Sequence, residues 1–190
     1  MRIGILRIGQ VDSVIVSRIQ ENLNMAFPET MCESISEKLP TPEEAFDKTR
    51  EQYNADIILS KIRVYAEKEK TLDKILGIVD IDIFSPELNF VFGKAECLGK
   101  AAVISLWRLK PEFHSAKQNF ELFVDRGTKE AVHELGHAFG LGHCLNPFCV
   151  MYFSNSIFET DRKQSLFCNV CHLKIENFMQ KLGGNIASEF

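Results

Sequence analysis

The sequence predicts an α/β domain built on a mixed β-sheet. Segments with the apolar spacing of strands alternate with segments that have the spacing of helices, which is the order of elements found in α/β folds. The chain has 190 residues, 45% of them hydrophobic, so it can bury one sizeable core but is too short for two full-sized domains. We therefore expect residues 1–190 to fold as a single domain.

The first half of the chain is expected to contain two strands and two helices. Short apolar runs indicate the strands, and apolar residues that recur every three or four positions indicate the helices. The elements, in the order strand, helix, strand, helix, are Ile3–Ile8, Val11–Phe27, Thr30–Ile35 and Ala55–Glu69. Pro40 and Pro42 break the chain between the second strand and the second helix.

The second half is expected to contain three strands and two helices. The expected strands are Leu72–Phe84, Phe90–Glu96 and Ala101–Leu109, and the expected helices are Asn119–Leu141 and Asn169–Leu182. Isoleucine and valine alternate with aspartate around Ile78–Ile83, which favours a strand there. A glycine-containing turn between the last two strands suits a hairpin.

Composition and charge bear on the class of partner. Twenty-two basic against 26 acidic residues give a net charge of −4, so no overall basic field attracts nucleic acid. Apolar stretches such as Ala101–Trp107 are far shorter than the roughly 18 to 20 residues of a membrane span. The first residues have an arginine within a short apolar run and no cleavage site for a secretory signal. We expect a soluble, cytoplasmic protein with no nucleic-acid or membrane partner.

A histidine motif in the Asn119–Leu141 helix carries the strongest chemical signal. His133 and His137 are four residues apart, so their imidazoles lie on one face of a helix and can reach a single zinc ion. Gly140 allows the helix to end with a residue at positive φ, after which the chain can turn sharply. That turn would bring His143 to the metal as a third ligand.

The number of ligands distinguishes a catalytic from a structural zinc. Three nitrogen ligands leave one coordination position open, whereas structural zinc is closed by four side chains. Zinc lowers the pKa of a bound water to about 7 and polarises a carbonyl that the water attacks. Glu134 is the candidate general base, which takes the proton of the water and hands it to the leaving amine. The motif predicts a zinc-dependent metallopeptidase.

Four of the six cysteines have the spacing of a second metal site. Cys32 and Cys97 are isolated and are interpreted as small buried apolar residues. The remaining four form a C-x4-C and a C-x2-C pair that match a closed tetrathiolate zinc site: Cys144, Cys149, Cys168 and Cys171. Free thiols or a redox-active C-x2-C pair are the alternatives, but a polar loop precedes the second pair where a thioredoxin-like strand would be needed. We expect two zinc ions per chain, one catalytic and one structural.

The residues from His133 to His143 resemble the elongated zinc motif of metzincin metalloproteases, and the residues that follow narrow the resemblance to the archaemetzincins. The third histidine is followed at once by Cys144, then by Cys149-Val-Met151, and later by the second cysteine pair. The resemblance implies that the four cysteines bind the structural zinc and that Met151 is the Met-turn residue beneath the catalytic metal. Weaker similarity extends to Ser105–Leu109 and to Phe153–Ser156.

The resemblance also implies a metzincin-type zincin fold. Such a fold has a twisted mixed sheet, an active-site helix behind it, and a small zinc-stabilised C-terminal subdomain, here about residues 143–190, below an N-terminal subdomain of about residues 1–142. A peptide or unfolded-protein substrate would lie along the edge strand Phe90–Glu96 by strand addition. The candidate substrate-contacting residues are Phe90, Phe92 and Phe153.

Two other functions compete with a peptidase. A zinc-stabilised interaction module with little or no peptidase activity needs no general base, so the presence of Glu134 argues against it. A nucleic-acid-binding zinc finger predicts a basic stripe beside the cysteines, but residues 144–175 contain three basic and two acidic residues. The oligomeric state stays open.

Overall fold

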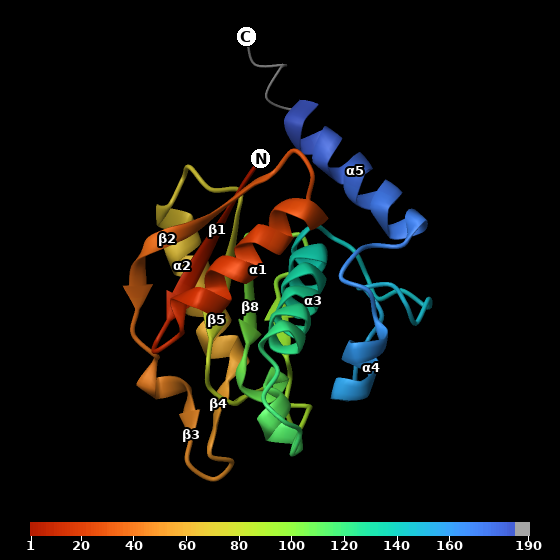
Figure 1. Cartoon of the computed structure of the whole chain (residues 1–190). Coiled ribbons are helices and arrows are strands. Elements are labelled where there is room, and N and C mark those ends of the chain that lie inside the picture. The colour runs from red at the N-terminus through yellow and green to blue at the C-terminus, as the bar shows by residue number, and fades with distance from the viewer. Residues whose placement is uncertain (185–190) are drawn as a thin grey trace.

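A five-stranded mixed sheet forms the centre of the computed structural model, which describes residues 1–184 and the side chains of residues 1–180 (Figure 1). The strand order is β2-β1-β5-β8-β7. Four strands are parallel, and β7 runs antiparallel to β8 at one edge. The strands are β1 (Arg2–Ile8), β2 (Met31–Leu39), β5 (Lys74–Val79), β7 (Gly93–Ala95) and β8 (Ala101–Ser105). The predicted fold class is confirmed.

Helices cover both faces of this sheet. The helices of the described residues are α1 (Ser13–Ala26), α2 (Ala55–Lys68), α3 (Phe120–Ala138), α4 (Ile157–Arg162) and α5 (Asn169–Gly184). α1 and α3 pack on one face and α2 on the other, while α4 and α5 follow α3 on its far side (Figure 1). None of these helices has the length and apolar composition that a membrane crossing requires.

The two cores follow from the alternation of side chains along the strands. Leu76 and Ile78 of β5 join the core with α1 and α3, whereas Ile75 and Val79 join the core with α2. Since both faces of the parallel strands are buried, β5 is apolar at nearly every position. This explains why the sequence reads as a continuous apolar run there.

Side chains at the helix starts satisfy backbone N–H groups that lack a helical partner. Asp12, Asn54 and Asn119 cap α1, α2 and α3 by accepting from the N–H of residues two or three positions later. These caps set the first residue of each helix, which the apolar periodicity alone placed only approximately.

A second, small sheet was not predicted. It contains β3 (Phe46–Asp47), β4 (Gln52–Asn54) and β6 (Ile83–Phe84), with β3 antiparallel and β6 parallel to β4. Strands of two or three residues are too short to show the alternation from which strands are predicted.

The predicted strand Leu72–Phe84 is wrong as a single element. The chain leaves the large sheet after β5 and enters the small sheet as β6. The intervening Asp80 and Asp82 form ion pairs with Lys110 and Arg108, which lie outside both strands. These contacts turn the chain away from the large sheet.

Two other predicted strands are shorter in the structure, and one helix was not predicted. β8 ends at Ser105 because the Ser105 hydroxyl donates to the carbonyl of Ile81 and accepts from the N–H of Trp107, after which residues 107–109 form a 3-10 helix. Only residues 93–95 of the predicted strand Phe90–Glu96 are a strand. α4 was not predicted; Ser156 and Glu159 form a capping box that starts this short helix.

Lys74 of β5 is buried beneath the end of α3. Its ammonium donates to the carbonyl oxygens of Gly99 at 2.7 Å and Ala138 at 2.8 Å. Burial lowers the pKa of Lys74 to about 8, because the charged form is poorly solvated there. Lys74 thereby satisfies a terminal helix carbonyl that has no partner within the helix.

We expect the stabilising contribution of Lys74 to increase with pH above about 8. The folded chain releases the Lys74 proton near pH 8, whereas the unfolded chain keeps it until about pH 10.5, so the unfolded state binds more protons in this window. Urea unfolding of the wild type and of Lys74→Met should show a difference in unfolding free energy that grows in favour of the wild type from pH 8 upward. A difference that is independent of pH would contradict this expectation.

Candidate functional site

α3 and the turn that follows it bring three histidines together. His133 and His137 lie one helical turn apart on α3, and His143 comes from the chain beyond the helix. One nitrogen from each imidazole lies within 4.8 Å of the others. The ring centres of His137 and His143 are 4.8 Å apart, and those of His133 and His137 are 4.6 Å apart. The structure thus gathers the three histidines that the motif predicted.

The turn depends on Gly140. This residue has a φ of 89°, and its N–H donates to the His137 carbonyl while the Leu141 N–H donates to the Gly136 carbonyl. These two bonds form a Schellman motif, which ends the helix and reverses the chain. A left-handed φ of this kind disfavours any residue with a side chain.

The histidines present the lone pairs that a metal ion requires. The Nδ1 atoms of His133 and His137 donate to the carbonyl oxygens of Val150 and Leu141 at 2.7 and 2.8 Å. Each neutral ring therefore has an unprotonated Nε2, and these two atoms are 3.1 Å apart. Two converging lone pairs at this distance repel unless a cation lies between them. Imidazole nitrogens arranged in this way fit zinc.

Burial keeps the three imidazoles neutral. It lowers the pKa of His133 well below its ordinary value and lowers the pKa of His137 and His143 as well. The charge of Lys163 lowers the pKa of all three, and neighbouring histidines add to the effect at His133 and His143. The neutral imidazole is the form that binds a metal.

Glu134 lies in the same cavity and is almost fully buried. Burial raises the pKa of its carboxyl well above the ordinary value, and the neighbouring charge of Glu130 raises it further. Lys163 and Lys94 oppose this shift. A carboxyl in this setting can take up and release a proton at the bottom of the cavity.

Gly93 of β7 makes room for the Glu134 side chain. A Cβ atom at position 93 would lie 2.6 Å from Glu134 Cγ, 2.8 Å from Glu134 Oε1 and 2.7 Å from the Val103 carbonyl oxygen. Such distances are well inside van der Waals contact, so the strand can approach the helix this closely only at a glycine. The sequence alone does not show this role, because it depends on β7 and α3 being neighbours in the fold.

β7 offers a free edge beside the cavity. The Ser105 N–H donates to the Phe92 carbonyl at 2.8 Å, and the Glu96 N–H donates to the Ala101 carbonyl at 3.0 Å. Hydrogen-bonded pairs alternate with non-hydrogen-bonded pairs in an antiparallel ladder, so the N–H and C=O groups of Gly93 and Ala95 point away from β8. They are available to an added strand.

The cavity has a volume of about 480 Å³, and its lining includes the three histidines and Glu134. The three predicted substrate-contacting aromatic residues, Phe90, Phe92 and Phe153, all lie in its lining. The ring centre of Phe153 is 4.9 Å from that of His143. Phe90 and Phe92 come from the segment before β7 and Phe153 from the chain after Met151, so two distant segments build the walls.

Met151 is fully buried against α3, next to Gly136. A Cβ atom at Gly136 of α3 would collide with Met151 Sδ, so the thioether packs directly against the helix that carries His133 and His137. The Met151 carbonyl accepts from the N–H of Cys144 at 2.9 Å. The assignment of Met151 as the Met-turn residue stays a prediction.

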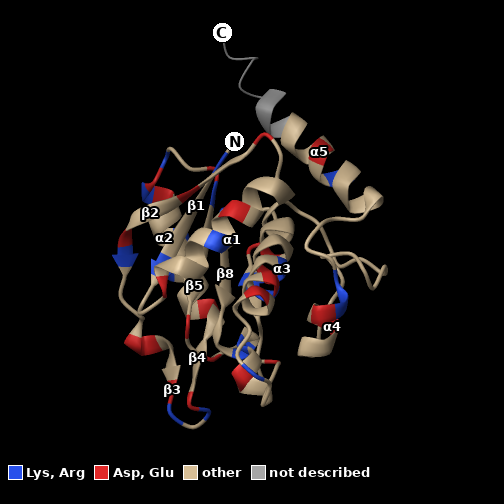
Figure 2. Ribbon diagram, in the orientation of Figure 1, with Lys and Arg blue, Asp and Glu red and all other residues tan. Residues whose placement is uncertain are grey.

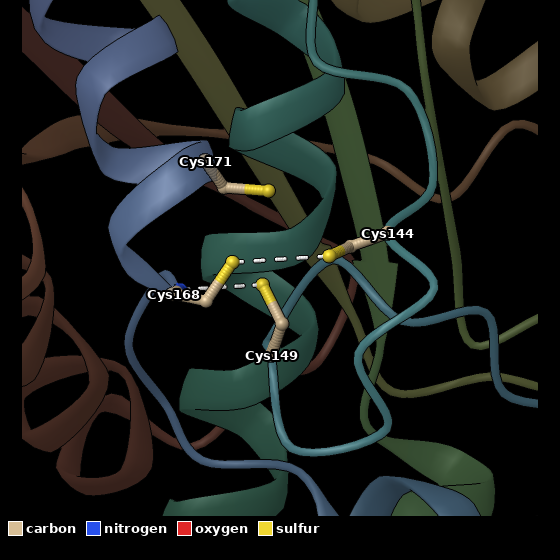
Figure 3. Close-up of side chains that lie close together, drawn as sticks. All are labelled: Cys144, Cys149, Cys168 and Cys171. Atoms are coloured by element: carbon tan, nitrogen blue, oxygen red, sulfur yellow. Dashed lines mark hydrogen bonds between the residues drawn. The ribbon is translucent and has the colours of Figure 1, made fainter.

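The four clustered cysteines meet on the other side of this loop (Figure 3). Their sulfur atoms lie within 4.8 Å of one another, and Cys144 Sγ is 3.8 Å from Cys168 Sγ. All four are free thiols. Four convergent sulfurs from two short pairs fit a closed zinc site. α4 and a loop precede Cys168, so the strand that a thioredoxin-like redox pair needs is absent from this part of the described chain.

The thiols differ in their environments. Backbone hydrogen bonding at Cys171 is the main reason that the pKa of Cys168 falls to about 7, whereas burial raises the pKa of Cys149 and Cys171. The Cys168 N–H donates to Cys149 Sγ at 3.4 Å (Figure 3). A thiolate at Cys168 would be the first ligand available to a metal ion.

The expectation for the isolated cysteines is half correct. Cys32 is buried in the core with α1, and burial raises its pKa to about 11. Cys97 is exposed and lines the cavity, so the prediction that it is a buried apolar residue is wrong. It lies in the turn between β7 and β8, where the chain has left the sheet core.

A buried ion pair beneath the site was also missed. Lys163 Nζ lies 3.2 Å from Glu130 Oε1, and the Thr160 hydroxyl donates to the same oxygen at 3.0 Å. Both charged side chains are almost completely buried. Glu130 precedes Glu134 by one helical turn, but no local signal pairs it with a residue 33 positions away.

Comparisons with known proteins agree with this geometry. The model of peptidase family M54 matches residues 8–177. An archaemetzincin from Methanocaldococcus jannaschii is 40% identical over 177 residues, which cover 93% of this chain and 94% of that protein. The crystal structure of an archaemetzincin from Methanopyrus kandleri has a TM-score of 0.83 at 36% identity and covers 95% of this chain and 96% of its own. A zinc-dependent peptidase from Methanocorpusculum labreanum has the same TM-score at 30% identity, with coverage of 91% and 99%.

We expect two zinc ions per chain, one in each cluster. His133→Ala should lose one ion, and Cys168→Ser should lose the other together with thermal stability, because structural zinc binding adds to the free energy of folding. Elemental analysis by mass spectrometry and a thermal melt would measure both effects, with Cys97→Ser as a control outside the clusters. A single zinc ion in the folded wild type would contradict the two-site arrangement.

Proposed function

Because the chain belongs to peptidase family M54, the archaemetzincins, and is therefore a zinc-dependent metallopeptidase, we propose that it hydrolyses extended peptides bound along β7, with Glu134 as general base. The observation that carries this proposal is the meeting of three imidazoles and one carboxylate in a single cavity beside a free strand edge. When bound by His133, His137 and His143, zinc would polarise the scissile carbonyl and lower the pKa of the attacking water.

Glu134 would move the proton. Its carboxylate would accept a proton from the water that attacks the scissile carbonyl and deliver it to the leaving amine when the peptide bond breaks. Burial suits this exchange, because a carboxylate in a poorly solvated site is a stronger base than one in water. Gly93 allows this side chain to lie against β7, beside the edge where the substrate would bind.

The substrate backbone would pair with the free edge of β7. The N–H and C=O groups of Gly93 and Ala95 would bond an extended peptide and align one of its bonds with Glu134. The support is that this edge lines the cavity that holds Glu134. A folded protein offers few such extended segments, so short or unfolded peptides are the proposed substrates.

Side chains of the substrate would contact Phe90, Phe92 and Phe153. All three reach the cavity, and large aromatic surfaces favour apolar partners. The polar groups of the site then fix the orientation of the substrate, while the walls select its side chains.

The four cysteines would hold a second zinc that supports the first site. Cys144 follows His143 directly, and its N–H bonds the Met151 carbonyl. A metal ion that fixes Cys144 would therefore also limit the motion of His143 and Met151. Groups that contact a metal ligand without binding the metal themselves commonly fix the orientation of that ligand.

We further propose a cytoplasmic location and no nucleic-acid partner. A reducing compartment keeps four free thiols available for zinc. Basic and acidic residues are interspersed on α3 and α4 (Figure 2), a pattern that gives no basic stripe for phosphate groups. The alternative function, an interaction module without peptidase activity, is not favoured, because the chain belongs to a family of peptidases.

We expect Glu134→Gln to reduce peptide cleavage by at least about 10²-fold while both zinc ions remain bound, because the amide cannot accept the proton. Mass spectrometry of a diverse peptide mixture incubated with the zinc-loaded protein would measure cleavage and its end-specificity together. Glu121→Gln, an exposed carboxylate on α3, is the matched control. Cleavage by Glu134→Gln at the wild-type rate would rule out the assigned base.

We expect Gly93→Ala to lower turnover on the order of 100-fold without loss of zinc. The added methyl group would displace the Glu134 carboxylate or the β7 strand, and a misplacement of about 1 Å can cost this much. Gly142→Ala is the matched control, because a Cβ atom there meets nothing within 4 Å. Equal activity of the two variants would show that Gly93 does not position the carboxylate.

A further inference from the structure

The segment of residues 85–92 forms one wall of the cavity, although it lies between β6 and β7 and has no regular structure. Its own backbone makes few bonds to the sheets. The Val91 N–H donates to the Ile83 carbonyl at 3.0 Å, and the Phe92 carbonyl accepts from Ser105 at 2.8 Å. The middle of the wall must therefore be held by side chains.

Two residues near β4 bind the backbone of this wall. Arg50 Nη2 donates to the carbonyl oxygens of Leu88 at 2.8 Å and Asn89 at 3.3 Å. Gln52 Nε2 donates to the Asn89 carbonyl at 3.0 Å and to Asp82 Oδ2, also at 3.0 Å. The small sheet thus supports the wall. Asp82 connects this support to Arg108, because it binds both Gln52 and Arg108.

Arg108 connects Asp82 to the aromatic side chains of the wall. Its Nε and Nη2 atoms donate to the two carboxylate oxygens of Asp82 at 2.6 and 2.7 Å, which is a bidentate pair. The two side chains are only 24% and 17% exposed. The guanidinium carbon lies 4.4 Å from the centre of the Phe90 ring, and Phe90 contacts Phe92 edge to face at 5.2 Å.

We propose that Arg108 is a positioning residue that holds the Phe90 ring in the cavity wall. The enzyme then prefers peptides with a large apolar or aromatic side chain beside the scissile bond. Arg108 is not part of the cavity lining, so it acts through Phe90. Leu88, Phe90 and Phe92 are apolar and all line the cavity. This proposal rests on the proposed peptidase function.

The chemistry of the contact requires arginine. A planar guanidinium binds both oxygens of Asp82 through two parallel N–H groups and presents its flat face to Phe90, a geometry that the compact ammonium of a lysine does not reproduce. Lys110 provides a natural comparison, because it pairs with Asp80 at 2.7 Å and packs over Trp107, outside the cavity. Arg108 lies in the Ser105–Leu109 segment, which resembles the archaemetzincins but contributes no residue to either candidate metal site. The proposed role of Arg108 gives this segment a function.

The test compares Arg108→Met with the matched control Lys110→Met. Peptides that are identical except for Phe, Leu or Ala on either side of one scissile bond are cleaved by the zinc-loaded proteins. We expect the wild type to prefer Phe over Ala in kcat/KM, Arg108→Met to reduce this preference about tenfold through KM, and Lys110→Met to retain it. No aromatic preference in the wild type, or equal losses for all peptides in Arg108→Met, would overturn the proposal.

A second variant shows whether Arg108 acts through Phe90. Phe90→Leu should reduce the preference by a similar factor, and the double variant should be no worse than Phe90→Leu alone, because the two residues form one contact chain. Arg108→Lys should behave like Arg108→Met. Losses that multiply in the double variant would place the effect of Arg108 elsewhere.

Measurements of binding distinguish a failure of this proposal from a failure of the proposed peptidase function. The affinities of Phe- and Ala-bearing peptide hydroxamates are measured by calorimetry on zinc-loaded Glu134→Gln, with and without Arg108→Met. A wild type that cleaves no peptide would refute the proposed function, yet a tenfold smaller affinity ratio in the Arg108 variant would still support its positioning role. An unchanged affinity ratio would overturn that role whatever the turnover.

Discussion

The helix end at Gly140 is the constraint on which the histidine cluster and the cysteine cluster both depend. Its left-handed φ and the two capping bonds of the Schellman motif reverse the chain, so that His143 meets the two histidines of α3. Because Cys144 is the next residue, the same turn delivers the first thiol to the cysteine cluster. The bond from Cys144 to the Met151 carbonyl then closes the loop beneath the helix. A helix that continued for one more turn would leave both clusters incomplete.

The position of the Glu134 carboxyl depends on the close approach of strand β7 to helix α3. β7 can lie against α3 because Gly93 has no side chain, and the Glu134 carboxyl occupies the space that remains. This packing buries the acidic side chain of Glu134. Burial raises the pKa of its carboxyl, and the charges of Lys163 and Lys94 oppose that rise. Burial of the Glu130–Lys163 pair under the same helix places further charge in a poorly solvated region. A buried ion pair of this kind adds little net stability, because removing both charges from water costs about as much as their attraction gains.

The predictions that succeeded rest on signals within a few residues of one another. The strands β1 and β8, the helices α1 and α2 and the histidine face of α3 follow from local spacing of apolar and polar residues. The run Leu72–Phe84 failed because apolar alternation does not show which sheet a residue joins, and Asp80 and Asp82 redirect the chain through partners about 26 to 30 residues away. The prediction that Cys97 is buried failed for a related reason, since residue type alone does not show that the chain has left the core at this position.

The sequence by itself indicated the reaction class and the candidate metal ligands, because helical geometry converts the spacing of His133 and His137 into one face and the cysteine pairs have the spacing of a metal knuckle. The tertiary structure alone decided how the carboxylate is placed and how the cavity is walled. Gly93 lies 41 positions from Glu134, and Arg108 lies 18 positions from Phe90. Contacts at these separations depend on the path of the chain across the sheet, and no local periodicity encodes that path.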